Sequence, residues 1–271
     1  MESNRPPVAL TIAGFDPSGG AGVIADIKTF TAFGCFATAA VTSLTYQNTT
    51  GVFGAANQTA EAVRAQVLPV VEDFHVAGVK TGMLPTREVI MEVARLVRET
   101  NLPAPIIDPV VRSTSGFDLI DDDALDALKS ELLPLARLLT PNLAEAERLT
   151  GLAGIRDEEG MREAARRLRA MGARAVLVKG GHLAGEALDV LDEEGHISRF
   201  RAERIETNST HGTGCTLAAA IAACLARGLT LREACASAKR FVTDAVRDAP
   251  GLGRGYGPVN HAVPARLLRE E

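Results

Sequence analysis

The stretch "VALTIAGFDPSGGAGVIADIKTFTAF", residues Val8 to Phe33, introduces the pattern that the rest of the chain repeats. Its first six residues, Val8–Ala13, form a short apolar run of the kind found in strands that are buried on both faces. A turn with closely spaced glycines follows, and helical spacing begins at about Ala21. The glycines do not match the G-x-G-x-x-G dinucleotide pattern, but they let a small planar ligand approach the backbone closely. The stretch therefore predicts a strand, a ligand-binding turn and a helix.

The same alternation of short apolar runs and amphipathic segments continues to the C-terminus. Further strands are predicted at Thr38–Gln47, Ala77–Gly82, Ala104–Asp108, Arg137–Thr140 and Ala175–Gly181. Further helices are predicted at about Thr59–Val70, Arg87–Thr100, Asp121–Ala136, Pro141–Gly151, Glu158–Gly172, Thr213–Arg227 and Leu231–Asp248. A hairpin is predicted over Ala187–Arg204, with its turn at Glu194–Gly195. Strands that alternate with helices imply right-handed crossovers, so we expect an α/β fold with a mainly parallel sheet covered on both faces.

The length and composition are those of one large α/β domain. The 271 residues are 46% hydrophobic and 23% charged, and no repeat or low-complexity linker divides them. We expect a single domain over residues 1–271, with residues 1–7 and 262–271 as peripheral tails. No apolar run approaches the ~20 residues of a transmembrane helix, and the first seven residues do not resemble a signal peptide. A cytoplasmic protein without a membrane partner is expected.

The charge pattern argues against nucleic acid as a partner. Lys and Arg number 29 against 34 Asp and Glu, for a net charge of −5. A protein that binds the phosphate backbone normally carries a basic stripe. The nearest approach to one, residues 161–175, mixes its arginines with Glu163 and apolar residues, which is typical of a solvated helix face.

The four cysteines have no metal-like spacing, and an intracellular chain of this size does not need disulfides. Cys35, Cys224 and Cys235 lie among apolar residues and are predicted to pack in the core. Cys215 is the exception, because it stands at the start of a helix behind a glycine-rich turn.

That turn, "THGTGC", spans Thr210 to Cys215. Gly212, Thr213 and Gly214 allow backbone N–H groups to point inward, and a helix N-terminus adds free N–H groups and a positive dipole end, so the turn predicts an anion site. The dipole also lowers the pKa of a thiol on the first turn. We therefore expect Cys215 to be a thiolate that accepts a proton from an attacking hydroxyl or orients it. An ordinary tight turn with a small space-filling residue is the alternative.

Polar side chains also follow other predicted strands, at the sheet edge where α/β proteins bind ligands. Asp26 is predicted to face the same cavity as the glycine turn, or else only to stabilise its helix start. Asn142 and Glu145 lie three apart at a helix start, which suits Mg²⁺ or, alternatively, helix capping. Lys179 ends a strand and can reach a phosphate. His182 has no metal-ligand spacing and is predicted to be a loop residue.

Seven segments occur in one order along the chain: "LTIAGFDPSGGAGVIADIKTF", "QNTTGV", "KTGMLP", "IDPVV", "LLTPNLAEAE", "VLVKGGH" and "THGTGCTLAAAIA". Together they resemble the bacterial hydroxymethylpyrimidine/phosphomethylpyrimidine kinases of thiamine biosynthesis, in the ribokinase-like superfamily. The resemblance covers roughly Val8 to His261. It implies a three-layer α/β/α sandwich, a homodimer, and two phosphorylations that use ATP and Mg²⁺. The substrates would be 4-amino-5-hydroxymethyl-2-methylpyrimidine and its monophosphate.

The resemblance also implies which positions hold the pyrimidine. These are Gly14, Ala21, Asp26, Gln47, Met83 and Val110. Gln47 offers the amide donor and acceptor that an aminopyrimidine needs. Met83 offers an adaptable apolar wall.

On the nucleotide side, the resemblance implies roles in binding phosphate, Mg²⁺ or ATP for Asn142, Glu145, Lys179, Thr210 and Lys239. Asp108 and Glu145 match the acids linked to the metal. Cys215 matches the catalytic position, where many sugar-kinase relatives carry aspartate. The N–H groups of Gly212–Cys215, assisted by Lys179, would stabilise the transferred phosphoryl group.

The nearest alternative is a pyridoxal or pyridoxine kinase of vitamin B6 salvage, whose substrates also carry a hydroxymethyl group. An apolar pocket separates ligands that differ by one methylene by only ~1–3 kcal/mol, so one sequence leaves this choice open. A ligand-binding regulator would be indicated by loss of Cys215 or of the pair Asn142 and Glu145, and all three are present. An NAD-dependent oxidoreductase would need the fingerprint that this chain lacks.

Overall fold

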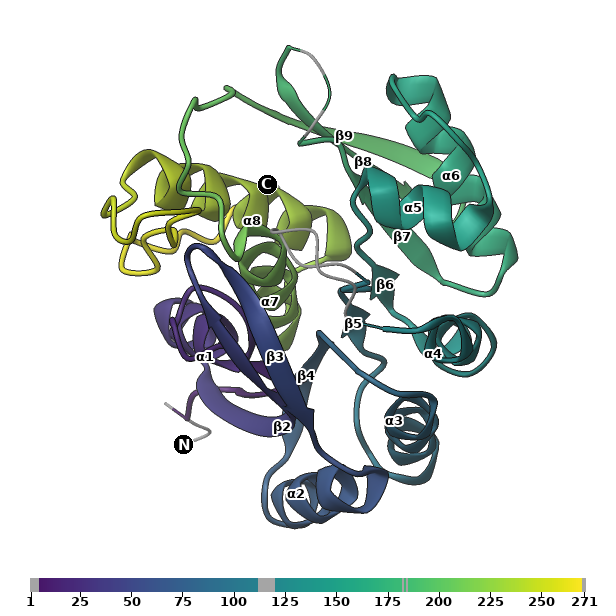
Figure 1. Cartoon of the computed structure of the whole chain (residues 1–271). Coiled ribbons are helices and arrows are strands. Elements are labelled where there is room, and N and C mark those ends of the chain that lie inside the picture. Colours follow the sequence, from purple (N-terminus) through teal and green to yellow (C-terminus); the bar gives the residue numbers. More distant parts are fainter. Residues whose placement is uncertain (1–4, 112–119, 182, 184, 270–271) are drawn as a thin grey trace.

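Nine strands form one sheet in the computed structural model, which describes residues 5–111, 120–181, 183 and 185–269 (Figure 1). The strand order is β3-β2-β1-β4-β5-β6-β7-β8-β9. Strands β2, β1, β4, β5, β6 and β7 run parallel, and β3, β8 and β9 are antiparallel additions at the two edges. The strands are β1 Val8–Phe15, β2 Phe36–Asn48, β3 Gly51–Asn57, β4 Val76–Thr81, β5 Ile106–Ile107, β6 Leu138–Leu139, β7 Ala175–Lys179, β8 Ala187–Glu193 and β9 His196–Ala202.

Helices cover both faces of the sheet, so the predicted three-layer α/β/α architecture is confirmed (Figure 1). One face carries α1 Gly22–Ala32, α7 Thr213–Ala226 and α8 Leu231–Arg247. The other carries α2 Ala60–Asp73, α3 Arg87–Glu99, α4 Asp122–Ala127, α5 Leu143–Thr150 and α6 Glu158–Ala170. None of the helices in the described ranges is long and apolar enough to cross a membrane.

Helix α7 lies at the centre of its layer. All residues from Leu217 to Cys224 are buried, and a Cβ added to Gly78 of β4 would lie 2.8 Å from the Ala222 carbonyl oxygen. Small side chains on both elements permit this close approach. This packing fixes the position of α7 against β4.

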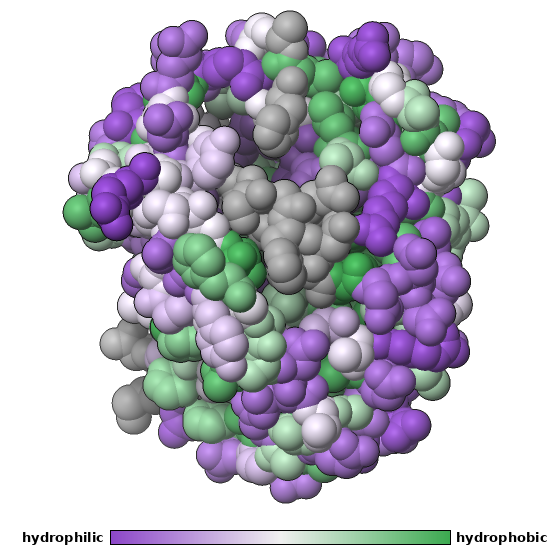
Figure 2. Space-filling view, in the orientation of Figure 1, coloured by the Kyte–Doolittle hydropathy of each residue, from purple (hydrophilic) through white to green (hydrophobic). Residues whose placement is uncertain are grey.

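The predicted hairpin is confirmed, and a second hairpin was not predicted. Glu194 and Gly195 have φ values of +53° and +90°, as a two-residue hairpin turn requires. Strand β3 has low strand propensity because of its glycines and alanines, and pairing with β2 stabilises it. Figure 2 shows apolar side chains over this β2–β3 hairpin, where Tyr46 and Phe53 are 56% and 69% exposed.

Two further segments differ from the prediction. The helix expected over Asp121–Ala136 is α-helical only to Ala127 and continues as a wider and then a tighter turn, because Pro134 cannot take part in regular helical bonding. Part of the expected C-terminal tail packs on the molecule. Val263 is buried in the core, and the Leu268 N–H donates to Ser237 Oγ at 2.8 Å.

Candidate active site

The parallel strands bring their carboxyl ends to one edge of the sheet, where α/β proteins bind ligands. The residues there are Asp16 after β1, Gly82 after β4, Asp108 after β5, Thr140 after β6 and Lys179 at the end of β7. The first turn of α7 reaches the same edge, because a Cβ added to Gly214 would lie 3.1 Å from Lys179 Nζ and 3.7 Å from Asp108 Oδ2. Residues that are far apart in the sequence thus form one site.

The two glycine-rich turns of the sequence touch each other. Gly212 has φ +79°, and a Cβ there would lie 1.8 Å from the Gly20 carbonyl oxygen. Gly22 has φ +55°, and a Cβ there would lie 2.2 Å from the Gly14 carbonyl oxygen. Only glycine fits both positions, since each needs a left-handed backbone and leaves no space for a side chain.

The THGTGC turn presents free backbone donors. Thr213 donates its N–H to the Thr210 carbonyl at 3.3 Å, so that N–H is engaged. Gly214 and Cys215 are the second and third residues of α7, and their N–H groups have no hydrogen-bond partner in the described part of the chain. With Lys179 Nζ beside Gly214, these donors make a site for an anion.

Three charged side chains converge beside these donors. Lys179 Nζ lies 2.9 Å from Asp108 Oδ1 and 4.0 Å from Glu145 Oε2. Burial lowers the pKa of Lys179, because it disfavours the charged ammonium. The negative charges of Asp108 and Glu145 outweigh this effect and raise the pKa. Lys179 likewise lowers the pKa of Asp108 against the effect of burial. For Glu145, burial prevails over the attraction of Lys179, and the Asp108 charge adds to it, so the pKa rises to about 7.

Asn142 and Glu145 form the capping arrangement that was the alternative to a metal site. Glu145 N–H donates to Asn142 Oδ1 at 2.9 Å, and Asn142 N–H donates to Glu145 Oε2 at 2.7 Å. This is a capping box at the start of α5. It also fixes the Glu145 carboxylate beside Lys179, so capping and a role in the site are compatible.

The surroundings of Cys215 oppose the expected thiolate. Burial of the sulfur raises its pKa to about 12, and the charges of Asp108 and Asp26 act in the same direction. The Lys80 charge and the Gly22 N–H favour the thiolate but do not compensate. The helix dipole can be predicted from the sequence, whereas this desolvation depends on tertiary packing. Desolvation therefore favours the protonated form of the Cys215 thiol at neutral pH.

Asp26 lies in the protein interior. Its side chain is fully buried, and Oδ2 accepts hydrogen bonds from Lys80 Nζ at 2.8 Å and from Thr11 Oγ1 at 2.6 Å. Its other oxygen, Oδ1, has no partner in the described part of the chain. One carboxylate oxygen thus remains able to accept a hydrogen bond.

The other residues predicted for the pyrimidine lie near the ends of β1, β2, β4 and β5 and at the start of α1. A Cβ added to Gly14 would lie 3.1 Å from the Met83 sulfur, so these two are in contact. Gln47 Nε2 donates to Thr45 Oγ1 at 2.7 Å, which in turn donates to the Phe15 carbonyl of β1 at 2.9 Å. Ala21 and Val110 stand on the turns that begin α1 and follow β5, and each is partly exposed.

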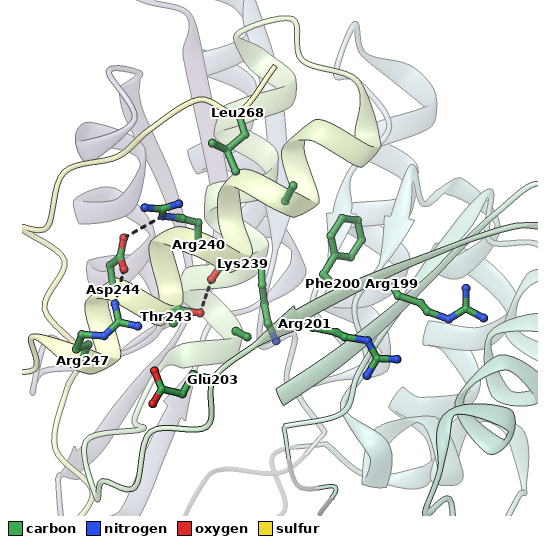
Figure 3. A pocket seen from close by; sticks show the side chains of 12 residues that line it. Arg199, Phe200, Arg201, Glu203, Lys239, Arg240, Thr243, Asp244, Arg247 and Leu268 are labelled. Carbon is green, nitrogen blue, oxygen red and sulfur yellow. Dashed lines mark hydrogen bonds and ion pairs between the residues drawn. The ribbon is translucent and has the colours of Figure 1, made fainter. Parts of the chain in front are cut away.

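Lys239 lies apart from Lys179. The Asp189 carboxylate bonds both to Lys239 and to Gly180, the residue that follows Lys179. The Asp189 carboxylate accepts from Lys239 Nζ at 2.8 Å and from the Gly180 N–H at 3.1 Å. Lys239 lines a cavity of about 490 Å³ between α8 and β9 (Figure 3). Five basic and two acidic side chains line this cavity together with Phe200.

Lys80, Asp16 and His211 belong to the site although no sequence pattern predicts a role for them. A lysine inside an otherwise apolar strand is a signal for a buried ion pair, and Lys80 fits that description. Asp16 and His211 stand inside two of the quoted motifs, but no local pattern pairs residues 195 positions apart. The expected loop residue His182 lies outside the described residues.

The chain is similar to known kinases over nearly its whole length. The sequence model of the phosphomethylpyrimidine kinase family matches residues 16–260. A hydroxymethylpyrimidine/phosphomethylpyrimidine kinase of Streptomyces coelicolor is 46% identical over 256 residues, which cover 94% of each chain. The thiamine biosynthesis bifunctional protein ThiED of Geobacter sulfurreducens is 50% identical over 96% of this chain, and the chain spans 53% of that longer protein.

A solved structure supports the same fold. An ADP complex of Bacillus subtilis pyridoxal kinase superposes with a TM-score of 0.87 and 36% identity. The match covers 95% of this chain and 98% of that one.

Proposed function

The chain belongs to the phosphomethylpyrimidine kinase family, and from that premise we propose that it is a bifunctional kinase of thiamine biosynthesis. It transfers the γ-phosphoryl group of ATP to the hydroxymethyl oxygen of 4-amino-5-hydroxymethyl-2-methylpyrimidine and then phosphorylates the monophosphate. The observation that carries the proposal is the convergence of the free Gly214 and Cys215 N–H groups with Lys179 at the carboxyl edge of the sheet.

The proposed reaction is a direct in-line transfer. The hydroxymethyl oxygen forms a bond to the γ-phosphorus as the bond to the ADP oxygen breaks, and the hydroxyl proton passes to an oxygen of the transferred phosphoryl group. The N–H groups of Gly214 and Cys215 and the ammonium of Lys179 stabilise negative charge on the transferred group. Such transfers depend mainly on positioning and electrostatics, and their loose transition states demand little activation of the attacking hydroxyl. A protonated Cys215 thiol therefore acts by orienting that hydroxyl.

The pyrimidine is proposed to bind between the end of β1 and the β4–α3 turn. Met83, packed on Gly14, supplies an apolar wall for the ring. Gln47 and the unpartnered Oδ1 of Asp26 supply hydrogen-bonding groups for its amino and hydroxymethyl substituents. Ala21 and Val110 border the ring from the adjoining turns.

Asp108 and Glu145 fit a role in holding Mg²⁺. Within the described ranges, no group of three or more His, Cys, Asp or Glu side chains is arranged to hold a metal ion. Mg²⁺ in nucleotide sites takes one or two carboxylates and completes its shell with water and phosphate oxygens, so two buried carboxylates suit it. When bound, Mg²⁺ would neutralise charge on the ATP phosphates.

The nucleotide is proposed to extend from Lys179 toward Lys239, along the link that Asp189 makes between them. Asn142 and Thr210 lie at the phosphate end. The basic cavity that Lys239 lines offers complementary charge and the aromatic surface of Phe200. The ADP complex of the structural relative supports a nucleotide as one substrate.

A B6 vitamer is the less favoured acceptor. Relatives named hydroxymethylpyrimidine/phosphomethylpyrimidine kinase are 41% to 48% identical to this chain, and the pyridoxal kinase is 36% identical. From the family likeness we further propose a cytoplasmic homodimer, which analytical ultracentrifugation would test.

The experiment is ADP release by the purified protein with Mg·ATP, offered the hydroxymethylpyrimidine, its monophosphate and pyridoxal side by side. Turnover of both pyrimidines, with pyridoxal far slower, is the expected result. Preference for pyridoxal would reassign the protein to vitamin B6 salvage. No turnover with any of the three would overturn the proposed function.

A further inference from the structure

We propose that Asp16 and His211 are positioning residues for this reaction. Their hydrogen bond holds the THGTGC turn against the loop that receives the pyrimidine, and so sets the distance between the phosphoryl group and its acceptor. The inference rests on the proposed function and concerns two residues that the catalytic scheme does not use.

The bond joins the two turns where they touch. His211 Nε2 lies 2.8 Å from Asp16 Oδ2, and the two side chains are 13% and 1% exposed. The imidazole lies on Gly20, because a Cβ added there would come within 2.5 Å of His211 Cδ2. The His211 backbone is fixed by its N–H, which donates to the Gly257 carbonyl at 3.0 Å.

The Asp16 carboxylate is fully used, so its geometry is tightly determined. Oδ1 accepts from the Ser18 N–H at 2.8 Å and from Ser18 Oγ at 2.7 Å. Oδ2 accepts from the Ala21 N–H at 2.9 Å and faces His211 Nε2. Burial opposes ionisation, but the bonds from His211 and Ser18 lower the pKa of Asp16. An ionised Asp16 can only accept, so His211 Nε2 is the donor in a charge-assisted bond.

One oxygen atom therefore joins the starts of two helices. Ala21 is the N-cap of α1, and His211 directly precedes Gly212, the N-cap of α7. The free N–H groups of Gly214 and Cys215 follow within three residues. A shift at this bond moves those donors relative to the acceptor loop, and a displacement of about 1 Å costs up to about 100-fold in rate.

The test compares His211→Gln with His211→Asn. The Gln amide nitrogen can reach the place of Nε2 and donate to Asp16, whereas Asn is too short to do so. Ser18→Ala is the matched control, because it removes a bond to the same carboxylate on the opposite oxygen. For each protein, kcat, KM for ATP and the stoichiometry of ADP binding by calorimetry would be measured with the hydroxymethylpyrimidine as acceptor.

We expect His211→Asn to lower kcat at least tenfold, with KM for ATP within about threefold of wild type and one ADP bound per chain. His211→Gln should recover most of the lost kcat, and Ser18→Ala should stay close to wild type. A wild-type kcat in His211→Asn, equal losses in both His211 variants, or loss of ADP binding would each overturn the inference. A wild-type protein without turnover would instead overturn the proposed function.

Discussion

Lys80 and Asp26 form an ion pair in which both side chains are completely buried, with 2.8 Å between Nζ and Oδ2. Burial lowers the pKa of Lys80, but the facing carboxylates of Asp26 and Asp108 prevail and raise it, so the lysine stays charged. For Asp26, burial prevails over Lys80 and raises the pKa. The Lys80 charge also acts on the Cys215 thiol of the THGTGC turn, where it favours the thiolate form.

Breaking this pair should destabilise the fold strongly. We expect Lys80→Met to cost ~3–5 kcal/mol of unfolding free energy, because it leaves a buried carboxylate without its partner. The double variant Lys80→Met/Asp26→Leu should recover much of that loss. Urea unfolding followed by circular dichroism measures both.

Arg166→Met is the control, because its partner Glu163 lies on an exposed helix face. That variant should change stability by less than about 1 kcal/mol. If Lys80→Met costs no more than the control, the buried pair does not stabilise the protein.

Cys215 should react slowly with iodoacetamide at neutral pH. Its pKa of about 12 means that the reactive thiolate is scarce, and the rate should rise about tenfold for each pH unit between 7 and 10. Mass spectrometry of the peptide that contains Cys215 separates this signal from those of the other cysteines. A rate that levels off near pH 8 would contradict the raised pKa.

Replacing the thiol tests its part in the chemistry. Cys215→Ala should lose most of its activity while it still binds ATP, because the backbone donors and Lys179 remain in place. Cys215→Ser keeps a hydroxyl that can orient the acceptor and should retain more activity than the alanine variant. Near-normal turnover by Cys215→Ala would remove the thiol from the mechanism.

Glu145 should make the stability of the protein fall as the pH rises. Its folded pKa of about 7 lies above its unfolded value of 4.5, so the folded state binds more protons between these limits and loses stability across them. Glu145→Gln keeps an acceptor for the Asn142 N–H. It should therefore be more stable than wild type at pH 8, with a smaller difference at pH 5.

Thermal unfolding at the two pH values measures this effect. Adding Mg·ATP at pH 8 should stabilise wild type more than Glu145→Gln, since the ion compensates the buried carboxylate. Identical pH profiles for the two proteins would show that Glu145 titrates normally.

Local sequence patterns predict most of the helices and strands. The hairpin turn at Glu194–Gly195 follows from residues that tolerate positive φ, and the start of α5 follows from the Asn142 and Glu145 spacing. Strand β3 could not be predicted from local propensity, because pairing with β2 stabilises it and strand propensity depends on such context. The irregular end of the 121–136 helix has a local cause that the sequence does contain. Pro134 has no N–H to donate to a helical hydrogen bond.

The alternation of strands and helices and the glycine-rich turns can be predicted from the sequence, because they depend on residues close together in the chain. The bond between Asp16 and His211, the effect of the Lys80 charge on Cys215 and the desolvation that favours its protonated thiol follow from tertiary packing. Hydrogen-bond partners across 195 positions and the desolvation of a sulfur atom depend on which distant segments pack together, and no local pattern contains that information.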